Sequence, residues 1–334
     1  ANTTASFNTA VGTDALLLNT TGASNTAVGQ GALDSNTTAS NNVAVGKGAL
    51  SANTTGANHI AVGQGAMLSN TTGNDNVAVG RQALDANTTG GSNVAMGSDA
   101  LGANTTASGN TGIGYNALLA NTTGTENVAV GMGALDATGA GTDGSYNVAV
   151  GNDALTANTE GQFNVAVGRR ALYANTTADE NTALGYLTLY TNTTGANNVA
   201  VGTSALQANT TASNNTAVGD RSLTANTTGS ENTAVGKSAA DAVTTGTRTV
   251  AVGYNAGGGL TTGDSNVAIG YQALMTEDEH SNNVAVGASA LQTQNAGAHA
   301  YNTAVGFEAG KANTTGTATV AIGAQALDAN TTGD

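Results

Sequence analysis

The sequence predicts an all-β fold, a parallel β-solenoid of the β-roll type with about 19 coils and a 17-residue period. The first observation is one block, Asn-[Thr/Val]-Ala-Val-Gly-x-x-Ala-Leu-x-Ala-Asn-Thr-Thr-Gly-x-x, that recurs 19 times from Asn8 to the end of the chain. The others are an invariant Gly and a β-branched stretch in every block. A fixed short period indicates that each block is one structural unit stacked on its neighbours. We number the coils from Asn8 and the positions within each coil from 1 to 17.

Position 5 is Gly in every coil, from Gly12 to Gly323. A position that accepts only Gly indicates φ > 0 or a backbone approach without room for a Cβ atom, so we expect a tight corner there. Position 15 is usually Gly but accepts Ala, as in Ala39 and Ala107. We therefore expect a second, less strained corner at position 15.

Positions 2 to 4 predict a short strand. Position 2 is always β-branched, position 4 is always aliphatic, and position 3 is Ala in every coil except at Gly112. Such period-two alternation is typical of a strand. Positions 8 to 14, with Leu at position 9 in 15 coils, predict a second extended segment.

The repeat predicts one continuous array over residues 1–334. Two coils are longer than the rest, with insertions near 138–146 and 293–301 that we expect to loop out at a corner. Solenoids need atypical polar caps, and both ends of this chain keep the ordinary repeat. We therefore expect a segment of a longer chain, or ends that abut other copies.

Both faces of the first strand lack charged residues in all 19 copies. A face in contact with water would accept a charge somewhere in that many copies. We therefore expect one face to line the interior of the coil and the other to pack on another chain. The chain is predicted to be a homo-oligomer.

Composition excludes several classes of protein. The net charge of -14 argues against nucleic acid or an anionic membrane surface as a partner. The chain has no Cys, so disulfides and thiolate metal sites are excluded, and no apolar stretch is long enough for membrane insertion. With few aromatic residues and 47 Gly, the interior must be thin and built from Ala, Val and Leu.

Charged and aromatic residues indicate the surface, since 25 of the 30 charged residues occupy positions 6, 7, 10, 16 and 17. Aromatic residues at positions 6 and 10 are candidates for contact with glycans, although scattered surface aromatics need no such explanation. The candidates are Tyr115, Tyr173, Tyr186, Tyr190, Tyr254, Tyr271 and Phe307.

Asn-Thr-Thr occurs in 14 copies and satisfies the N-glycosylation rule, for example at Asn53 and Asn226. We favour a side-chain amide ladder along the stacked coils instead. The two Thr columns also suggest ice binding. That is a minor alternative, because neighbouring strand residues point to opposite sides and cannot share one flat face.

Catalytic and cofactor sites have no support, so we expect a protein that is not an enzyme, with no cofactor and no metal. The residues His59, His280 and His299 are isolated from any recurring nucleophile or acid. The only acidic cluster is at 277–280, where a solvated corner is favoured over a cation site because the ligands are consecutive.

Asn266-Val267-Ala268-Ile269-Gly270, and near-copies such as Asn76-Val77-Ala78-Val79-Gly80, resemble the head repeats of YadA-type trimeric autotransporter adhesins. The resemblance implies a left-handed parallel β-roll with three chains around an axis. The complete 17-residue unit is more similar to the shafts of repeat-rich phage tail-fibre and bacterial surface proteins.

These expectations combine into a structural shaft of an extracellular fibre, which is a surface adhesin, a phage tail fibre or a self-assembling filament. The expected partner is the chain itself, as a trimer or an end-to-end polymer. A cell-surface glycan or host receptor would be bound through flanking domains. The alternative is a lateral binding module for glycans or, with less support, for ice.

Overall fold

The computed structural model describes residues 4–136, 144–277, 279–295 and 300–333. The chain divides into two compact units, Ala1–Val167 and Gly168–Asp334. The two insertions expected from the sequence overlap residues 137–143 and 296–299, which lie outside the described residues, as does His299.

Each coil contributes one parallel strand of three residues, and the strands stack as a β-solenoid with a period of about 17 residues. Among the described residues there is no helix. The strands of the first unit are β1 (Thr9–Val11), β2 (Thr26–Val28), β3 (Val43–Val45), β4 (Ile60–Val62), β5 (Val77–Val79), β6 (Val94–Met96), β7 (Thr111–Ile113), β8 (Val128–Val130), β9 (Val148–Val150) and β10 (Val165–Val167). Those of the second unit are β11 (Thr182–Leu184), β12 (Val199–Val201), β13 (Thr216–Val218), β14 (Thr233–Val235), β15 (Val250–Val252), β16 (Val267–Ile269), β17 (Val284–Val286), β18 (Thr303–Val305) and β19 (Val320–Ile322). The predicted fold class is confirmed.

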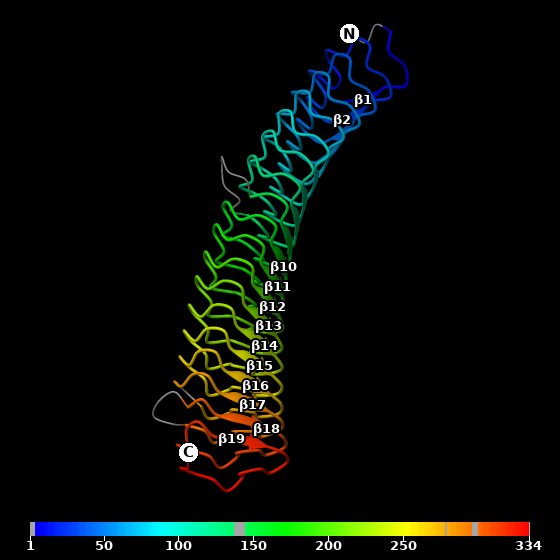
Figure 1. Cartoon of the computed structure of the whole chain (residues 1–334). Helices are drawn as coiled ribbons and strands as arrows, with labels where there is room; N and C mark the ends of the chain where they lie inside the picture. The colour runs from blue at the N-terminus through cyan, green and yellow to red at the C-terminus, as the bar shows by residue number, and fades with distance from the viewer. Residues whose placement is uncertain (1–3, 137–143, 278, 296–299, 334) are drawn as a thin grey trace. The chain divides into compact units, whose positions relative to one another are not determined.

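Neighbouring strands pair in register, so each residue lies beside its counterpart in the next coil. Thr182 pairs with Val199 and Ala183 with Ala200, and the same register continues through the second unit (Figure 1). In the first unit, Ala44 pairs with Ala61 in the same way. The columns recognised in the sequence are therefore physical columns of stacked side chains.

The Gly at position 5 ends every strand. Gly185 has φ 142°, and a Cβ atom on it would lie 2.6 Å from the carbonyl oxygen of Gly202 in the next coil. Both reasons for Gly, an unusual φ and a close backbone approach, therefore apply. The predicted tight corner is confirmed.

Position 15 differs from position 5, because its glycines are absent from the positive-φ set. A Cβ atom on Gly124 would lie 2.5 Å from the Gly144 carbonyl oxygen. Ala39 and Ala107 occupy this position and are buried. The backbone conformation at this corner is therefore one that an L-residue can adopt, which explains why Ala is accepted here and not at position 5.

The prediction of a second extended segment was wrong. Positions 6 to 11 form turns, with local backbone bonds such as Asn36 N–H to Leu33 C=O (3.3 Å). Leu33 and Leu50 at position 9 have φ 50° and 54°. This left-handed conformation costs about 1–2 kcal/mol for a non-Gly residue. Burial of the Leu side chain, worth about 1.5–3 kcal/mol, offsets that cost. The apolar periodicity could not distinguish this turn from a strand, because an inward-pointing Leu is expected in both.

The core lies inside the coils, between the strand and the turn segment. Ala27, Ala32 and Leu33 are fully buried, as are their counterparts in most other coils. Positions 1 and 3 of the strand point into this interior, and positions 2 and 4 point outward. The expectation that one strand face lines the coil is confirmed; packing of the other face on a partner stays a prediction.

Candidate binding surface

A ladder of Asn side chains runs through the interior at position 12. In the first unit, Asn53 Nδ2 donates to Asn36 Oδ1 (3.1 Å) and Asn70 Nδ2 donates to Asn53 Oδ1 (3.0 Å). Asn53 Nδ2 also donates to the carbonyl of Gly56 (2.8 Å) at the position-15 corner. Each amide group thus uses both of its N–H bonds, which is the condition for burying it at low cost.

A second Asn ladder runs at position 1. Asn93 N–H donates to Asn76 Oδ1 (2.9 Å), while Asn76 Nδ2 donates to the Gly90 carbonyl (2.8 Å). The position-12 Asn87 donates to the same Gly90 carbonyl (2.9 Å). The two ladders therefore converge on the position-15 corner and tie the strand to the turn segment within each coil.

The Asn-Thr-Thr sites are part of this interior. Asn53 and Asn226 are fully buried and belong to the position-12 ladder. A glycan on either residue would require the coil to open. The ladder interpretation of these columns is confirmed.

His59 replaces the position-1 Asn of coil 4 and reproduces its hydrogen bonds. Its Nδ1 accepts from Asn76 N–H (3.2 Å), and its Nε2 contacts the Gly73 carbonyl (2.7 Å). This pattern requires a neutral imidazole with the proton on Nε2. Burial lowers the pKa of His59, which favours the neutral form. His59 is therefore a structural substitute for Asn and not a candidate catalytic base.

The position-12 ladder is interrupted in the second unit by Val243, Leu260, Glu277 and Gln294, all fully buried. Among the described residues, Asn226 Oδ1, at the edge of this interruption, has no hydrogen-bond partner. The interior therefore tolerates residues other than Asn, but the neighbouring amide loses a donor.

Glu277 lies in this interruption, and the prediction that the acidic cluster is a solvated corner was wrong for this residue. Its carboxylate is fully buried, with Oε1 2.6 Å from Nδ1 of His280. Asn283 Nδ2 lies 3.5 Å from Oε2. A buried carboxylate needs such a partner. Within the part of the chain that the structure describes, no group of three or more metal-binding side chains is present.

The two Thr columns have different surroundings. At position 13, Thr71 Oγ1 donates to the Thr88 carbonyl of the next coil (3.0 Å), and this bond recurs along both units. At position 14, Thr72 is exposed. One column is thus part of the hydrogen-bonded framework and the other faces solvent, so the two do not form a single flat hydroxyl face.

The outer strand face consists of positions 2 and 4 and carries only Thr, Val, Ile, Leu and Met side chains. Its Ala neighbours at position 3 are buried, whereas Met96 is 41% exposed and Leu184 is 46% exposed. Aliphatic side chains therefore remain partly in water in coil after coil. A large exposed apolar surface of this kind is typical of an interaction site.

The candidate aromatic residues all lie on the surface or at its edge. Tyr115, Tyr186, Tyr254, Tyr271 and Phe307, all at position 6, are exposed, while Tyr173 and Tyr190 at position 10 are half-buried. Stacked pairs form where neighbouring coils carry rings, as in Tyr254–Tyr271 (ring centroids 5.5 Å apart) and Tyr173–Tyr190 (5.2 Å). Sequence columns indicated this stacking once the coils were known to be in register.

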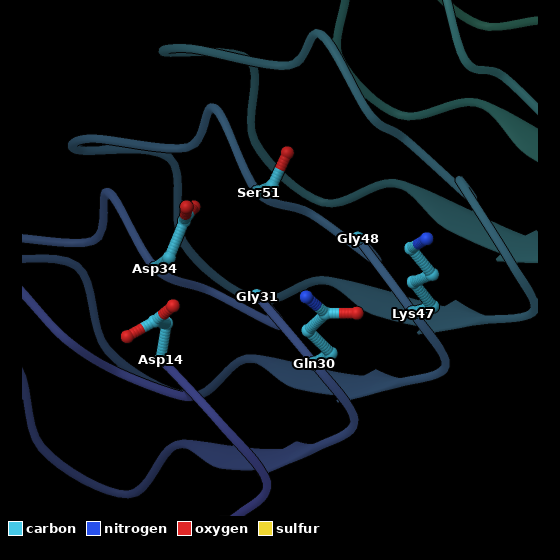
Figure 2. Close-up of a pocket in the computed structure, with 7 residues that line it drawn as sticks. All are labelled: Asp14, Gln30, Gly31, Asp34, Lys47, Gly48 and Ser51. Carbon is cyan, nitrogen blue, oxygen red and sulfur yellow. The ribbon is translucent and has the colours of Figure 1, made fainter.

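A shallow hollow lies on the first unit where position 7 is Gly. It has a volume of about 280 Å³, and Figure 2 shows Gly31 and Gly48 between Asp34 on one side and Lys47 on the other. The absent side chains at position 7 create the space. The residues that line it are mainly polar, and the repeat pattern gave no signal for it.

Burial raises the pKa of Asp85, Asp136 and Asp241, which share position 10 with Asp34.

The described residues contain no helix that is long and apolar enough to cross a membrane. The described coils are stacked and hydrogen-bonded to one another, and they carry an aliphatic outer face. Comparison with protein-family models, with curated proteins and with solved structures yields no match.

Proposed function

We propose that this chain is a structural shaft of an extracellular fibre, whether a surface adhesin, a phage tail fibre or a self-assembling filament. Its copies associate, as a trimer, through the outer strand face. The shaft provides reach and stiffness, and it carries out no chemistry. Binding of a cell-surface glycan or host receptor would reside in flanking domains.

The observation that carries this proposal is the outer strand face. It is free of charge in all 19 coils, yet side chains such as Leu184 and Val199 remain 46% and 39% exposed in a single chain. Every apolar Å² removed from water by a partner contributes about 25 cal/mol. A second copy presents the same face with the same spacing between coils, so it matches the pattern along the whole sheet. The resemblance of the strand motif to trimeric adhesin head repeats supports three copies.

The interior supports a mechanical role. In regular coils such as coils 11 to 13, hydrogen bonds link one coil to the next through the strand, the two Asn ladders and the position-13 Thr column. Pulling two coils apart must break all of these bonds together. Such a construction favours a stiff element over a binding site that has to rearrange.

The mass of the folded chain in solution tests the proposal. Light scattering should give three times the chain mass of 32.2 kDa. Two outward substitutions, Val79→Lys and Val201→Lys, place charges on the outer strand face and should dissociate the oligomer or weaken it strongly. Thr72→Lys at the exposed position 14 is the matched control and should leave the mass unchanged.

A folded wild-type chain with a monomeric mass would overturn the trimer. Electron microscopy of the same sample separates a discrete trimer from an end-to-end polymer. A trimer that binds no immobilised glycan and does not inhibit ice recrystallisation would leave the shaft as the remaining function.

Lateral glycan binding is the second candidate, and one observation favours it. The exposed position-6 rings of Tyr254 and Tyr271 stack on each other. At coils 10 and 11, Arg169 lies over the Tyr186 ring and Arg170 over the Tyr173 ring, which stacks on Tyr190. Ice binding is less supported, because the position-13 hydroxyls donate to backbone carbonyls and only position 14 faces solvent.

A further inference from the structure

We propose that Arg169, Tyr186 and the stacked pair Tyr173–Tyr190, on coils 10 and 11, form a binding site for an anionic sugar, one that carries a carboxylate or a sulfate. This inference goes beyond the shaft and does not depend on it. We call these four residues, together with Arg170, the Arg–Tyr patch; all belong to the second unit.

The first argument is the rarity of the residues that meet there. The chain has eight Lys and Arg residues and 3% aromatic residues, with a net charge of -14. Two of those cations and three of those aromatics lie on two successive coils, and Arg169-Arg170 is the only pair of adjacent cations in the sequence. In the other coils, acidic residues outnumber Lys and Arg at positions 7 and 10. Arg169 and Arg170 therefore place two adjacent positive charges on a chain that is acidic overall.

The second argument is geometric. The Arg169 guanidinium carbon lies 5.9 Å from the centroid of the Tyr186 ring, and that of Arg170 lies 5.5 Å from the Tyr173 ring. Tyr173 in turn stacks on Tyr190 with 18° between the ring planes. Cation–π contacts of this kind hold a guanidinium in place without consuming its hydrogen-bond donors. The side chains are thus ordered before a ligand arrives, which lowers the cost of binding.

The third argument is that Arg169 still has donors to offer. In the described part of the chain, three other cations pair with carboxylates: Arg81 with Asp99 (2.9 Å), Lys237 with Asp220 (3.5 Å) and Lys311 with Glu308 (2.6 Å). Arg169 is exposed and forms no ion pair with a described residue. A guanidinium binds a carboxylate or a sulfate through two parallel N–H bonds. The patch therefore selects for negative charge.

The fourth argument concerns what lies beside the charge. Tyr186 is 44% exposed and lies at position 6, outside the strand face of positions 2 and 4. An exposed ring offers an apolar surface for the C–H face of a pyranose, and Tyr hydroxyls pair with sugar hydroxyls. An extended acidic peptide would gain most by adding to a sheet edge, but the residues of the patch lie at positions 6, 7 and 10, in the turn segment and not on a strand. The chemistry fits an acidic sugar better.

The experiment is a titration of the full chain with single sugars, followed by calorimetry or by saturation-transfer NMR. N-acetylneuraminic acid and glucuronic acid carry a carboxylate, glucosamine 6-sulfate carries a sulfate, and galactose and N-acetylglucosamine are neutral. We expect the anionic sugars to bind and the neutral ones to bind at least about tenfold more weakly, since a hydrogen bond to a charged group is worth about 1.5–3 kcal/mol. Binding should weaken at high ionic strength.

Two variants test the assignment with residues that position 6 already accepts. Arg169→Gln should reduce the affinity for anionic sugars by about tenfold or more, converting the site to one that no longer prefers them. Tyr186→Thr should weaken all sugars that bind. Tyr254→Thr with Tyr271→Thr is the matched control, because that stacked pair has no adjacent Arg, and it should leave binding unchanged.

Three results would overturn the proposal: equal binding of neutral and anionic sugars, unchanged binding by Arg169→Gln, or equal or tighter binding of a poly-glutamate peptide. The last result would assign the patch to acidic protein segments instead. Circular dichroism of each variant, compared with the wild type, shows whether the coil is intact, so that a loss of binding is not mistaken for unfolding.

Discussion

The position-12 column has two contrasting stretches. In the first unit, Asn19 to Asn121 form an unbroken amide ladder. In the second unit, the same column runs through Val243, Leu260, Glu277 and Gln294, which are apolar, charged and long, yet all fully buried. The backbone follows the same repeat in both. The contrast shows that the solenoid requires a filled interior, and that Asn is one way of filling it.

Position 9 explains how the interrupted stretch stays packed. A regular coil combines a large position-9 side chain with Asn, as in Leu84 and Asn87, whereas coil 15 combines Gly257 with Leu260. A Cβ atom on Gly257 would lie 2.9 Å from Leu260 Cδ1, so the Leu side chain occupies the space that a position-9 side chain normally fills. In coil 15, positions 9 and 12 therefore act as one packing unit.

The largest expected effect comes from breaking the ladder where it is regular. Asn70→Leu deprives Asn53 Oδ1 of its donor (3.0 Å) and Asn87 Nδ2 of its acceptor (2.8 Å), beside a retained Met67. Each buried polar group left unpaired costs about 1–3 kcal/mol, so we expect a loss of about 3 kcal/mol or more. Hydrogen exchange of amides in coils 3 to 5 measures it. Native protection in the variant would show that the ladder contributes little.

The next effect tests the packing unit in the interrupted stretch. Leu260→Ala leaves a cavity beside Gly257 and should cost about 2–5 kcal/mol. The double change Gly257→Leu with Leu260→Ala refills that cavity from position 9 without adding a polar group and should cost much less. Urea unfolding monitored by circular dichroism compares the two. If the double variant is as unstable as Leu260→Ala, the idea that positions 9 and 12 compensate each other is wrong.

A smaller effect is expected when the imidazole of His59 at position 1 is compared with the amide of the usual Asn. Burial lowers the folded-state pKa of His59 from its ordinary 6.5, so the unfolded chain binds more protons just below that pH. The stability contributed by neutral His59 is therefore complete above 6.5 and declines as the pH falls towards the folded pKa. His59→Asn should remove this part of the pH dependence. The measurement is the difference between the urea midpoints of the variant and the wild type, taken once at about pH 5 and once at about pH 8. Because the other titrating groups are the same in both proteins, the change in this difference reports His59 alone. Parallel pH profiles would contradict the assignment.

The smallest effect compares two neighbouring Thr residues. Thr71 Oγ1 donates to the Thr88 carbonyl (3.0 Å), whereas Thr72 is exposed. Thr71→Ala should cost about 1 kcal/mol, the net value of one hydrogen bond, and Thr72→Ala less than about 0.5 kcal/mol. Thermal unfolding distinguishes them. Equal costs would mean that the position-13 hydroxyl column is not a stabilising element.

Much of the fold could be predicted because the repeat provides many comparisons within one chain. The strand at positions 2 to 4, the corner at Gly185 and its counterparts, and the amide ladder through Asn53 all follow from what each position accepts. These features are set by local steric limits or by identical neighbours in the next coil. Both kinds of constraint limit which residue types a position accepts.

The turn segment could not be predicted because its residues give no local signal. Leu33 and the other position-9 Leu residues adopt φ near 50°, which no propensity for Leu indicates, since tertiary burial decides it. The buried setting of Glu277 was missed for a similar reason: its His280 partner follows three residues later in an otherwise acidic stretch. The Arg–Tyr patch required the in-register stacking, which brings residues about 17 apart into contact.

In-register identity has a consequence for folding. A chain whose coils are nearly interchangeable can pair each strand with a wrong coil, one repeat away, with almost no loss of contacts. Contacts that only one particular pair of successive coils can make reduce this ambiguity: Arg81 pairs with Asp99 of the next coil (2.9 Å), and Tyr173 stacks on Tyr190 of the next coil. Such departures from the consensus repeat therefore favour the correct pairing of coils over pairings that are shifted by one repeat.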